Sequence, residues 1–330
     1  MAVQKQGSTG NNFYNDKPLY SGAHFTIEVD GIGKGIKDLP TLRSVEGGGA
    51  KADVVSYQMG ENGDIWRQLG KTKYDDIKLT FGLADVDGFR SWIYDFLQGT
   101  MTRKNGAILA ADYKYKEQAR RKFEQAMIVG LGLPKFDAND KNQANVTITL
   151  APEKVTYEKG TGATITSQDP SEATQRRIAA CNFTFSLDGF ETETARTVKV
   201  EAMEIKVKTI EHHVSYSGDK VSFEPTKVPG RLEWPNLVFS VPETDAEPFR
   251  KLHNDRVTGT KKDQGQGLGA SLIFFNNKKE KMGEIQFMGV HIFNVQSEKS
   301  DASSEEMKLV KIECALEQIV IKTAWVKKQK

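Results

Sequence analysis

The feature of this sequence that most constrains its fold is an internal repeat with a period near 160 residues. The stretch Leu69–Gly82 (LGKTKYDDIKLTFG) is matched by Val228–Val241 (VPGRLEWPNLVFSV). In both stretches a glycine precedes a basic residue, an aromatic residue follows, and an alternating apolar run comes next. A repeat of about 20 to 50 residues would indicate a solenoid or propeller, whereas a unit of this length is a whole domain. The sequence therefore predicts a tandem duplication of one domain.

Flanking segments repeat at nearly the same spacing. Phe25–Gly31 (FTIEVDG) matches Phe183–Gly189 (FTFSLDG) at a separation of 158 residues, and Val146–Glu153 matches Val310–Glu317 at 164. Such small changes in spacing are expected where loops differ in length between conserved elements. The polar N-terminus reads as a flexible arm, and the stretch 158–177, which has no aromatic residue, reads as a linker. The predicted division is an arm 1–19, a first domain 20–157, a linker 158–177 and a second domain 178–330.

Composition and charge exclude several classes of protein. The 330 residues are 38% hydrophobic and 27% charged, which is typical of a globular chain. No stretch approaches the roughly 18 apolar residues of a membrane span, and the N-terminus has no signal-peptide core, so we expect synthesis in the cytoplasm and no membrane insertion. Because 46 basic residues nearly balance 44 acidic ones, we expect no dedicated binding of nucleic acid.

Apolar patterning predicts a mainly β fold, of the α+β class, with one helix in each repeat. The helix of the first repeat is Asp85–Leu97, with Asp85 as its cap and Gly99 as its stop. The helix of the second repeat is Thr244–Asp255, with a capping box from Thr244 to Glu247. The predicted strands of the first repeat, apart from the Leu69–Gly82 stretch, are His24–Ile32, Leu42–Glu46, Asp53–Met59, Ile108–Tyr113, Phe123–Val129 and Ala144–Leu150.

The second repeat is expected to follow the same order. Its predicted strands, besides Val228–Val241, are Phe183–Leu187, Thr197–Thr209, Leu272–Phe275, Ile285–Phe293 and Leu309–Ile321. The alternation in Thr197–Thr209 changes phase at Ala202 and Met203, which suggests a bulge. In the first repeat the three glycines Gly47–Gly49 break the corresponding strand, and a turn is expected at Gly60–Gly63. The basic segment Lys114–Lys122 is interpreted as a solvated hairpin tip.

No motif in the chain calls for enzyme chemistry. Gly70, Lys71 and Thr72 resemble the end of a phosphate loop, but Ile65 stands where the earlier glycine is needed and a strand follows rather than a helix. The glycine loops Gly31–Gly35 and Gly265–Gly269 do not open the helix of a βαβ unit. We therefore interpret Gly70 as a turn leading into a strand, and we predict no catalytic and no cofactor-binding residues.

Histidines and cysteines also lack the spacing of a metal site. His212 and His213 are adjacent, so on a strand their side chains point to opposite faces. The other three histidines stand alone: His24, His253 and His291. Cys181 and Cys314 both fall in the second repeat, and we expect free, buried thiols rather than a disulfide. No metal ligands and no cofactor are predicted.

The order of these motifs resembles that of the tail tube proteins of contractile phages and phage-derived contractile injection systems. The resemblance spans most of Tyr20–Tyr157 and includes the strand ending in Asp30-Gly31-Ile32, the step Val45-Glu46-Gly47, the stretch Leu69–Gly82 and the tryptophan-containing helix. The second repeat matches more loosely, and Leu252 replaces the tryptophan of the helix, Trp92. The resemblance implies a small β-barrel or sandwich with one flanking helix, and rings of six domains that stack into a hollow tube.

Two domains in one chain would let three chains close a pseudo-sixfold ring. The resemblance implies that Gly47–Arg67, and less closely Met203–Ser222, stack one ring on the next. The expected partners are further copies of the chain, a tail sheath, and baseplate hub or spike proteins, with DNA or protein cargo passing through the lumen. One alternative is a single adaptor ring between a threefold spike or hub and the sixfold tube. Another is a soluble β-sandwich binding module or an enzyme with an unrecognised site.

Overall fold

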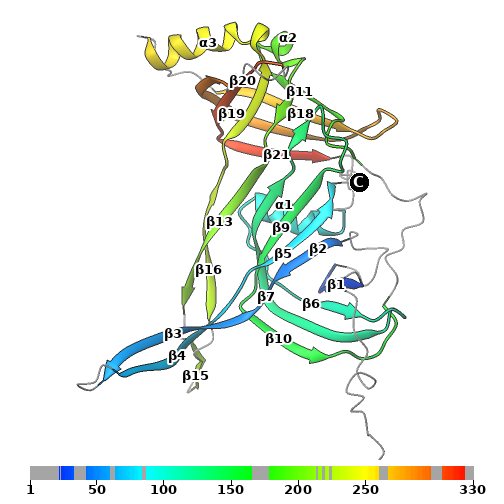
Figure 1. Ribbon diagram of the computed structural model, residues 1–330, viewed down its shortest axis with the longest axis vertical. Helices are drawn as coiled ribbons and strands as arrows, with labels where there is room; N and C mark the ends of the chain where they lie inside the picture. Colours follow the sequence, from blue (N-terminus) through cyan, green and yellow to red (C-terminus); the bar gives the residue numbers. More distant parts are fainter. Residues whose placement is uncertain are drawn as a thin grey trace, which may run out of the picture.

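The computed structural model describes residues 22, 24–32, 42–59, 64–83, 87–165, 178–212, 215–217, 220–222, 225–259, 267–298 and 307–323. Within these ranges the protein is built mainly of antiparallel strands, in agreement with the predicted fold class (Figure 1). The predicted arm 1–19, the turn Gly60–Gly63, the helix cap Asp85 and most of the linker lie outside the described residues.

The elements of the first half are mostly strands. They are β1 (Phe25–Val29), β2 (Leu42–Gly47), β3 (Ala50–Met59), β4 (Asp64–Tyr74), β5 (Ile77–Gly82), a 3-10 turn (Asp87–Phe89), α1 (Arg90–Leu97), β6 (Lys104–Ala111), β7 (Glu117–Leu133), β8 (Phe136–Asp137), β9 (Asn145–Ala151) and β10 (Lys154–Lys159).

The second half follows a similar plan. Its elements are β11 (Phe183–Leu187), α2 (Glu191–Thr194), β12 (Lys199–Val200), β13 (Met203–His212), β14 (Ser215–Ser217), β15 (Lys220–Ser222), β16 (Thr226–Glu233), β17 (Leu237–Pro242), a 3-10 turn (Glu243–Asp245), α3 (Glu247–His253), a π-helical turn (Asn254–Thr258), β18 (Leu268–Phe275), β19 (Lys281–Ser297), β20 (Leu309–Ala315) and β21 (Gln318–Thr323).

The two halves have sheets with the same strand order. The first sheet runs β1-β6-β7-β9-β5-β2, with β10 paired to β7. The second runs β11-β18-β19-β20-β17-β12, with β21 paired to β19. Each strand of the second sheet takes the place of the strand at the same position in the first. The sequence repeat thus has a counterpart in the order of the strands, and a tandem duplication as its origin stays a prediction.

A ladder between the halves joins the two sheets. Met203–Lys206 of β13 pair antiparallel with Gly130–Leu133 of β7. The ladder resumes where Lys199 and Val200 of β12 pair with Asp137 and Phe136 of β8. Beyond this junction β13 continues with β16 as a long two-stranded ribbon that runs down beside the first sheet (Figure 1).

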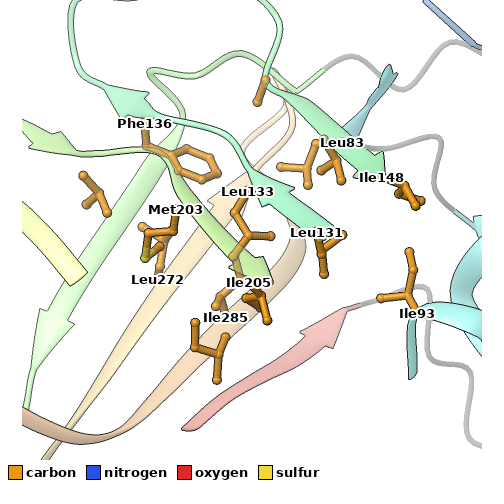
Figure 2. Close-up of a cluster of buried hydrophobic side chains, with 14 of the residues drawn as sticks. Leu83, Ile93, Leu131, Leu133, Phe136, Ile148, Met203, Ile205, Leu272 and Ile285 are labelled. Atoms are coloured by element: carbon orange, nitrogen blue, oxygen red, sulfur yellow. The ribbon is translucent and has the colours of Figure 1, made fainter. Parts of the chain in front are cut away.

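One hydrophobic core extends through both halves. Leu131 and Leu133 of β7 lie with Ile205 of β13 and with Leu272 and Ile285 of the second sheet (Figure 2). All five side chains are at most 5% exposed. Since burying a large aliphatic side chain contributes about 1.5–3 kcal/mol, the inter-repeat part of this core is a substantial share of the stability of a domain.

Helix α1 follows the prediction closely. Phe89, Trp92, Ile93 and Phe96 are buried at the predicted spacing, and Gly99 adopts the left-handed conformation with φ of 77°. The predicted capping box of the second helix is wrong. Helix α3 begins at Glu247 with no side-chain cap, because the Thr244 hydroxyl instead contacts Asp245 and Arg196.

Two predicted strands of the second repeat are each divided in the structure. The stretch Thr197–Thr209 contains β12 and β13, separated at Glu201 and Ala202, so the predicted bulge at Ala202 and Met203 is wrong. The phase change marks the point where the chain leaves its own sheet and pairs with β7. The stretch Leu309–Ile321 contains β20 and β21, which pair with different parts of β19.

The predicted break at the three glycines is confirmed. Gly47 and Gly48 have φ of 80° and 71°, a region that side-chain-bearing residues avoid. A Cβ atom on Gly47 would lie 2.0 Å from the carbonyl oxygen of Asp76. The chain therefore needs glycine here to pass from β2 into β3.

Candidate assembly surfaces

The hairpin formed by β3 and β4 projects from the body of the protein as a nearly free two-stranded ribbon (Figure 1). Its base is fixed by ion pairs of Lys51 with Asp75 and of Lys73 with Asp53, and these hydrogen-bonded partners raise the pKa of both lysines. An isolated two-stranded hairpin is marginally stable in water. A partner is therefore expected along its length.

Large apolar side chains are exposed on this hairpin. Leu69 is 74% exposed, and the other members of the set are Val54, Val55, Tyr57, Ile65 and Trp66, each at least 42% exposed. Tyr57 and Trp66 stand opposite each other in the register, as do Val54 and Leu69. Clustered apolar side chains of this kind mark a protein interaction surface.

The ribbon of β13 and β16 is the counterpart of this hairpin in the second repeat. At its start Met203, Ile205 and Val207 are buried against the first sheet, whereas Ile210 is 59% exposed further along. The two ribbons share an irregularity, because the register shifts between Ala52 and Val54 in one and between Val207 and Thr209 in the other. The second ribbon is therefore anchored on the first repeat through β7.

The repeated glycine of the sequence has a physical role at these shifts. A Cβ atom on Gly70 would lie 3.3 Å from the carbonyl oxygen of Asp53, and one on Gly230 would lie 2.8 Å from that of Lys208. At each register shift one residue faces two, since Asp53 stands opposite Gly70 and Lys71, and Lys208 stands opposite Gly230 and Arg231. The expectation of a turn at Gly70 is wrong, since Gly70, Lys71 and Thr72 lie inside β4. The glycine is needed because it lies in the bulge of its own strand, where the backbone of the facing strand approaches closely.

A buried lysine ties β16 to the first repeat. Lys227 is 2% exposed, and its Nζ donates to the carbonyl of Tyr74 and to Oδ1 of Asp76, both at 3.0 Å. Its backbone N–H donates to Oε1 of Glu153 at 3.1 Å, and Arg103 donates both to Glu153 and to the Lys227 carbonyl. Every charge in this junction has a partner, which a buried ammonium requires. Sequence reasoning missed Lys227 because a lysine near a strand end is usually solvated.

The basic segment Lys114–Lys122 is only partly the predicted hairpin tip. The turn itself is closed by Asp112, whose Oδ1 accepts the backbone N–H groups of Lys114 and Lys116, and these bonds lower its pKa. From Glu117 onward the chain is in β7. There Arg120 donates to Glu117 at 2.7 Å and to Glu28 at 3.3 Å. Arg120 and Lys122 thus form ion pairs within the structure, and Arg121 donates to the Gly47 carbonyl.

The hydrogen bond from Arg120 lowers the pKa of Glu117, whose side chain is 2% exposed. The Thr161 hydroxyl donates to the same carboxylate at 2.6 Å. Because Thr161 follows β10, this contact holds the start of the predicted linker against β7.

The histidines are separate from one another in the described structure. The His24 ring bonds the Asp112 carbonyl and stacks on Tyr115, His253 bonds the Phe293 carbonyl, and His291 lies 3.2 Å from Glu317. His213 lies outside the described residues. Among the residues that are described, no group of three or more potential ligands is placed to hold a metal ion.

Both cysteines are free thiols. Cys314 is buried in the core, and burial raises the pKa of its thiol, whereas Cys181 is half-buried rather than buried as expected. No helix in the described part of the chain has the length and apolar character needed to cross a membrane.

Comparison with protein families gave a match to the first half of the chain. Residues 21–156 match the model of the T4-like virus tail tube protein gp19. This matched segment covers β1 to β9 and the first half of β10, including the exposed hairpin. Comparison with curated proteins gave no match.

Solved structures with similarity to the chain come from contractile injection systems. The sheath-tube complex of the extracellular contractile injection system PVC in its extended state is 20% identical, with 47% of this chain and 99% of that chain covered and a TM-score of 0.36. The sheath/tube terminator of the same system is 20% identical over 43% and 99% of the two chains, at 0.36. The tube terminating cap of the anti-feeding prophage AFP is 18% identical over 47% and 100%, at 0.37.

Proposed function

We propose that this chain, whose residues 21–156 form a tail tube domain of the T4-like gp19 family, is a structural subunit of a phage tail or contractile injection system tube. Three two-domain chains close a pseudo-sixfold ring, and the rings stack into a hollow conduit for DNA or protein cargo. The chain consists of tube domains 20–157 and 178–330, preceded by an arm 1–19 and joined by a linker 158–177. It is made in the host cytoplasm and resides in the virion tail or injection particle.

The observation that carries this proposal is the ladder between β7 and β13. It adds a strand of the second repeat to the sheet of the first, so two like domains already stand side by side with a continuous sheet. Repetition of one such contact by rotation generates a closed ring when the rotation divides a full turn. The equal strand order of the two sheets supports placing both repeats in equivalent positions.

The exposed hairpin of β3 and β4 supports stacking. Its apolar side chains would be covered by the adjacent ring, which satisfies the requirement for a partner along this ribbon. The tail sheath and the baseplate hub or spike are the further partners expected of such a tube.

A second candidate is an adaptor that forms a single ring between a threefold spike or hub and the sixfold tube. Divergence between the repeats favours it, because the tail tube model matches only residues 21–156. Unlike halves give a ring whose true symmetry is threefold and whose outline is nearly sixfold.

Electron microscopy of the purified chain separates these possibilities. Long hollow polymers are expected for a repeating tube subunit, and isolated threefold rings for an adaptor. Particles that remain monomeric across a wide range of concentration would contradict both, and would favour a soluble binding module.

A further inference from the structure

The contact between the two repeats of one chain is made by two strand segments. The segments at the matching positions of the opposite repeats are not paired with each other in the described structure. Ile205 and Lys206 of β13 pair with Leu131 and Gly130 of β7. Each side of this contact has a counterpart in the other repeat. The strand registers identify the residues of the second repeat that match this stretch of β7, and those of the first repeat that match this stretch of β13.

On the β7 side the counterpart is the end of β19. The register of β7 with β9 shifts between Ile128 and Gly130, and that of β19 with β20 shifts between Ile292 and Asn294. Asn294 therefore takes the place of Gly130, and Val295 takes the place of Leu131. Within the described residues Asn294 and Val295 pair with β20, and no strand pairs with them on the opposite side.

On the β13 side the counterpart is the start of β3. Lys206 faces Glu233, one residue before Trp234, and Lys51 faces Lys73, one residue before Tyr74. The register shift follows at the same distance in both ribbons. Lys51 and Ala50 therefore take the places of Lys206 and Ile205, and in the described structure they pair with β4 alone.

A group of side chains that is buried in the first repeat is more exposed at the matching positions of the second repeat. Met127, Val129 and Ala151 form a small buried cluster with Met101 packed against it. Arg103 and Glu153, which are two residues from Met101 and Ala151 in the sequence, both bond Lys227. The matching positions in the second repeat are His291, Phe293 and Ala315. Val129 is 7% exposed whereas Phe293 is 41% exposed, and Ala315 is exposed whereas Ala151 is fully buried.

We propose that the start of β3 in one chain adds to the end of β19 in a second copy of the same chain, antiparallel, with Lys51 opposite Asn294 and Ala50 opposite Val295. This contact rests on the proposed ring and supplies the joint between chains. Arg67 takes the place of Lys227 in the register, and Glu317 takes the place of Glu153. In the proposed joint Arg67 of one chain therefore faces Glu317 of the next. In the second repeat Gly267 stands at the position that Arg103 occupies in the first. In the proposed joint the guanidinium of Arg67 therefore supplies to Glu317 the positive charge that Arg103 supplies to Glu153.

Paired cysteines test this register. Facing residues of two paired strands have Cα atoms about 4.5–5.5 Å apart, within the range of a disulfide. The test variant carries Lys51→Cys and Asn294→Cys in a Cys181→Ser background. The matched control carries Lys51→Cys and Glu313→Cys, because Glu313 faces Asn294 from β20 and lies a further strand spacing of about 5 Å away. Ring formation is measured separately by native mass spectrometry.

Under mild oxidation the test variant is expected to give a covalent trimer on a denaturing gel without reductant, and the control is expected to stay monomeric. Reductant should return the trimer to monomer, and peptide mapping should find the bond between residues 51 and 294. Trimeric rings that form without cross-linking above the control would overturn the register and leave the proposed ring intact. Monomers in native mass spectrometry would overturn both.

Discussion

Lys227 illustrates how much one side chain can contribute when it joins two domains. Replacing it with methionine keeps most of the volume but removes the charge that contacts Tyr74 and Asp76. We expect the free energy of unfolding to fall by about 1–3 kcal/mol, since a buried charged hydrogen bond is lost. Urea denaturation measures this change. The control Lys208→Met, at a side chain 79% exposed beside Glu233, should change stability by less than about 0.5 kcal/mol.

Glu117 predicts a pH dependence of stability. Its pKa in the folded protein lies below the ordinary value because Arg120 donates to the carboxylate. A lowered folded-state pKa contributes stability above the unfolded-state pKa, and that stability is lost as the pH falls through the folded-state value. Glu117→Gln should therefore be less stable than the natural chain at pH 7, with a difference that shrinks below about pH 4.3. Denaturation curves at several pH values measure it; a difference that is constant with pH would contradict the assignment.

At the scale of elements, the break between β2 and β3 depends on glycine for two separable reasons. Gly47 and Gly99 have nearly equal φ, but a Cβ atom meets the Asp76 carbonyl at Gly47 and nothing within 4 Å at Gly99. Gly99→Ala should cost about 1 kcal/mol for the left-handed conformation alone. Gly47→Ala should cost clearly more, because the backbone must also move. Thermal unfolding of the two variants compares them, and equal losses would show that the Asp76 carbonyl moves aside at little cost.

Sequence patterns predicted most strands and helix α1, because alternation and helical spacing report which face of an element is buried. They did not predict where Thr197–Thr209 divides. A phase change at Ala202 looks the same whether the strand bulges or exchanges its partner, and here the new partner is β7 of the other repeat. The junction at Lys227 was equally hidden, since Asp76 and Glu153 are distant in sequence. Side chains that join domains carry no local periodicity.

At the scale of the whole molecule, the hairpin of β3 and β4 predicts a separation of ring formation from stacking. The variant Val55→Ser with Trp66→Ser removes two exposed apolar side chains and keeps both Lys51 and Arg67, the residues of the hairpin that the proposed joint uses. We expect rings of normal mass and much shorter tubes in electron microscopy. Tyr94→Ser, at an exposed position on α1, serves as control and should leave tube length unchanged. Full-length tubes from the double variant would show that this hairpin does not mediate stacking.

The ladder between β7 and β13 also has a consequence for the rate of assembly. It forms as each chain folds, so in the proposed ring every second joint is complete before two chains have met. Tethered domains meet at an effective concentration set by their linker, in the millimolar range for short flexible linkers, whatever the amount of protein in the cell. Closing a ring then requires three chains to collide rather than six. Early in expression, when chains are scarce, this lowers the concentration at which the first ring appears.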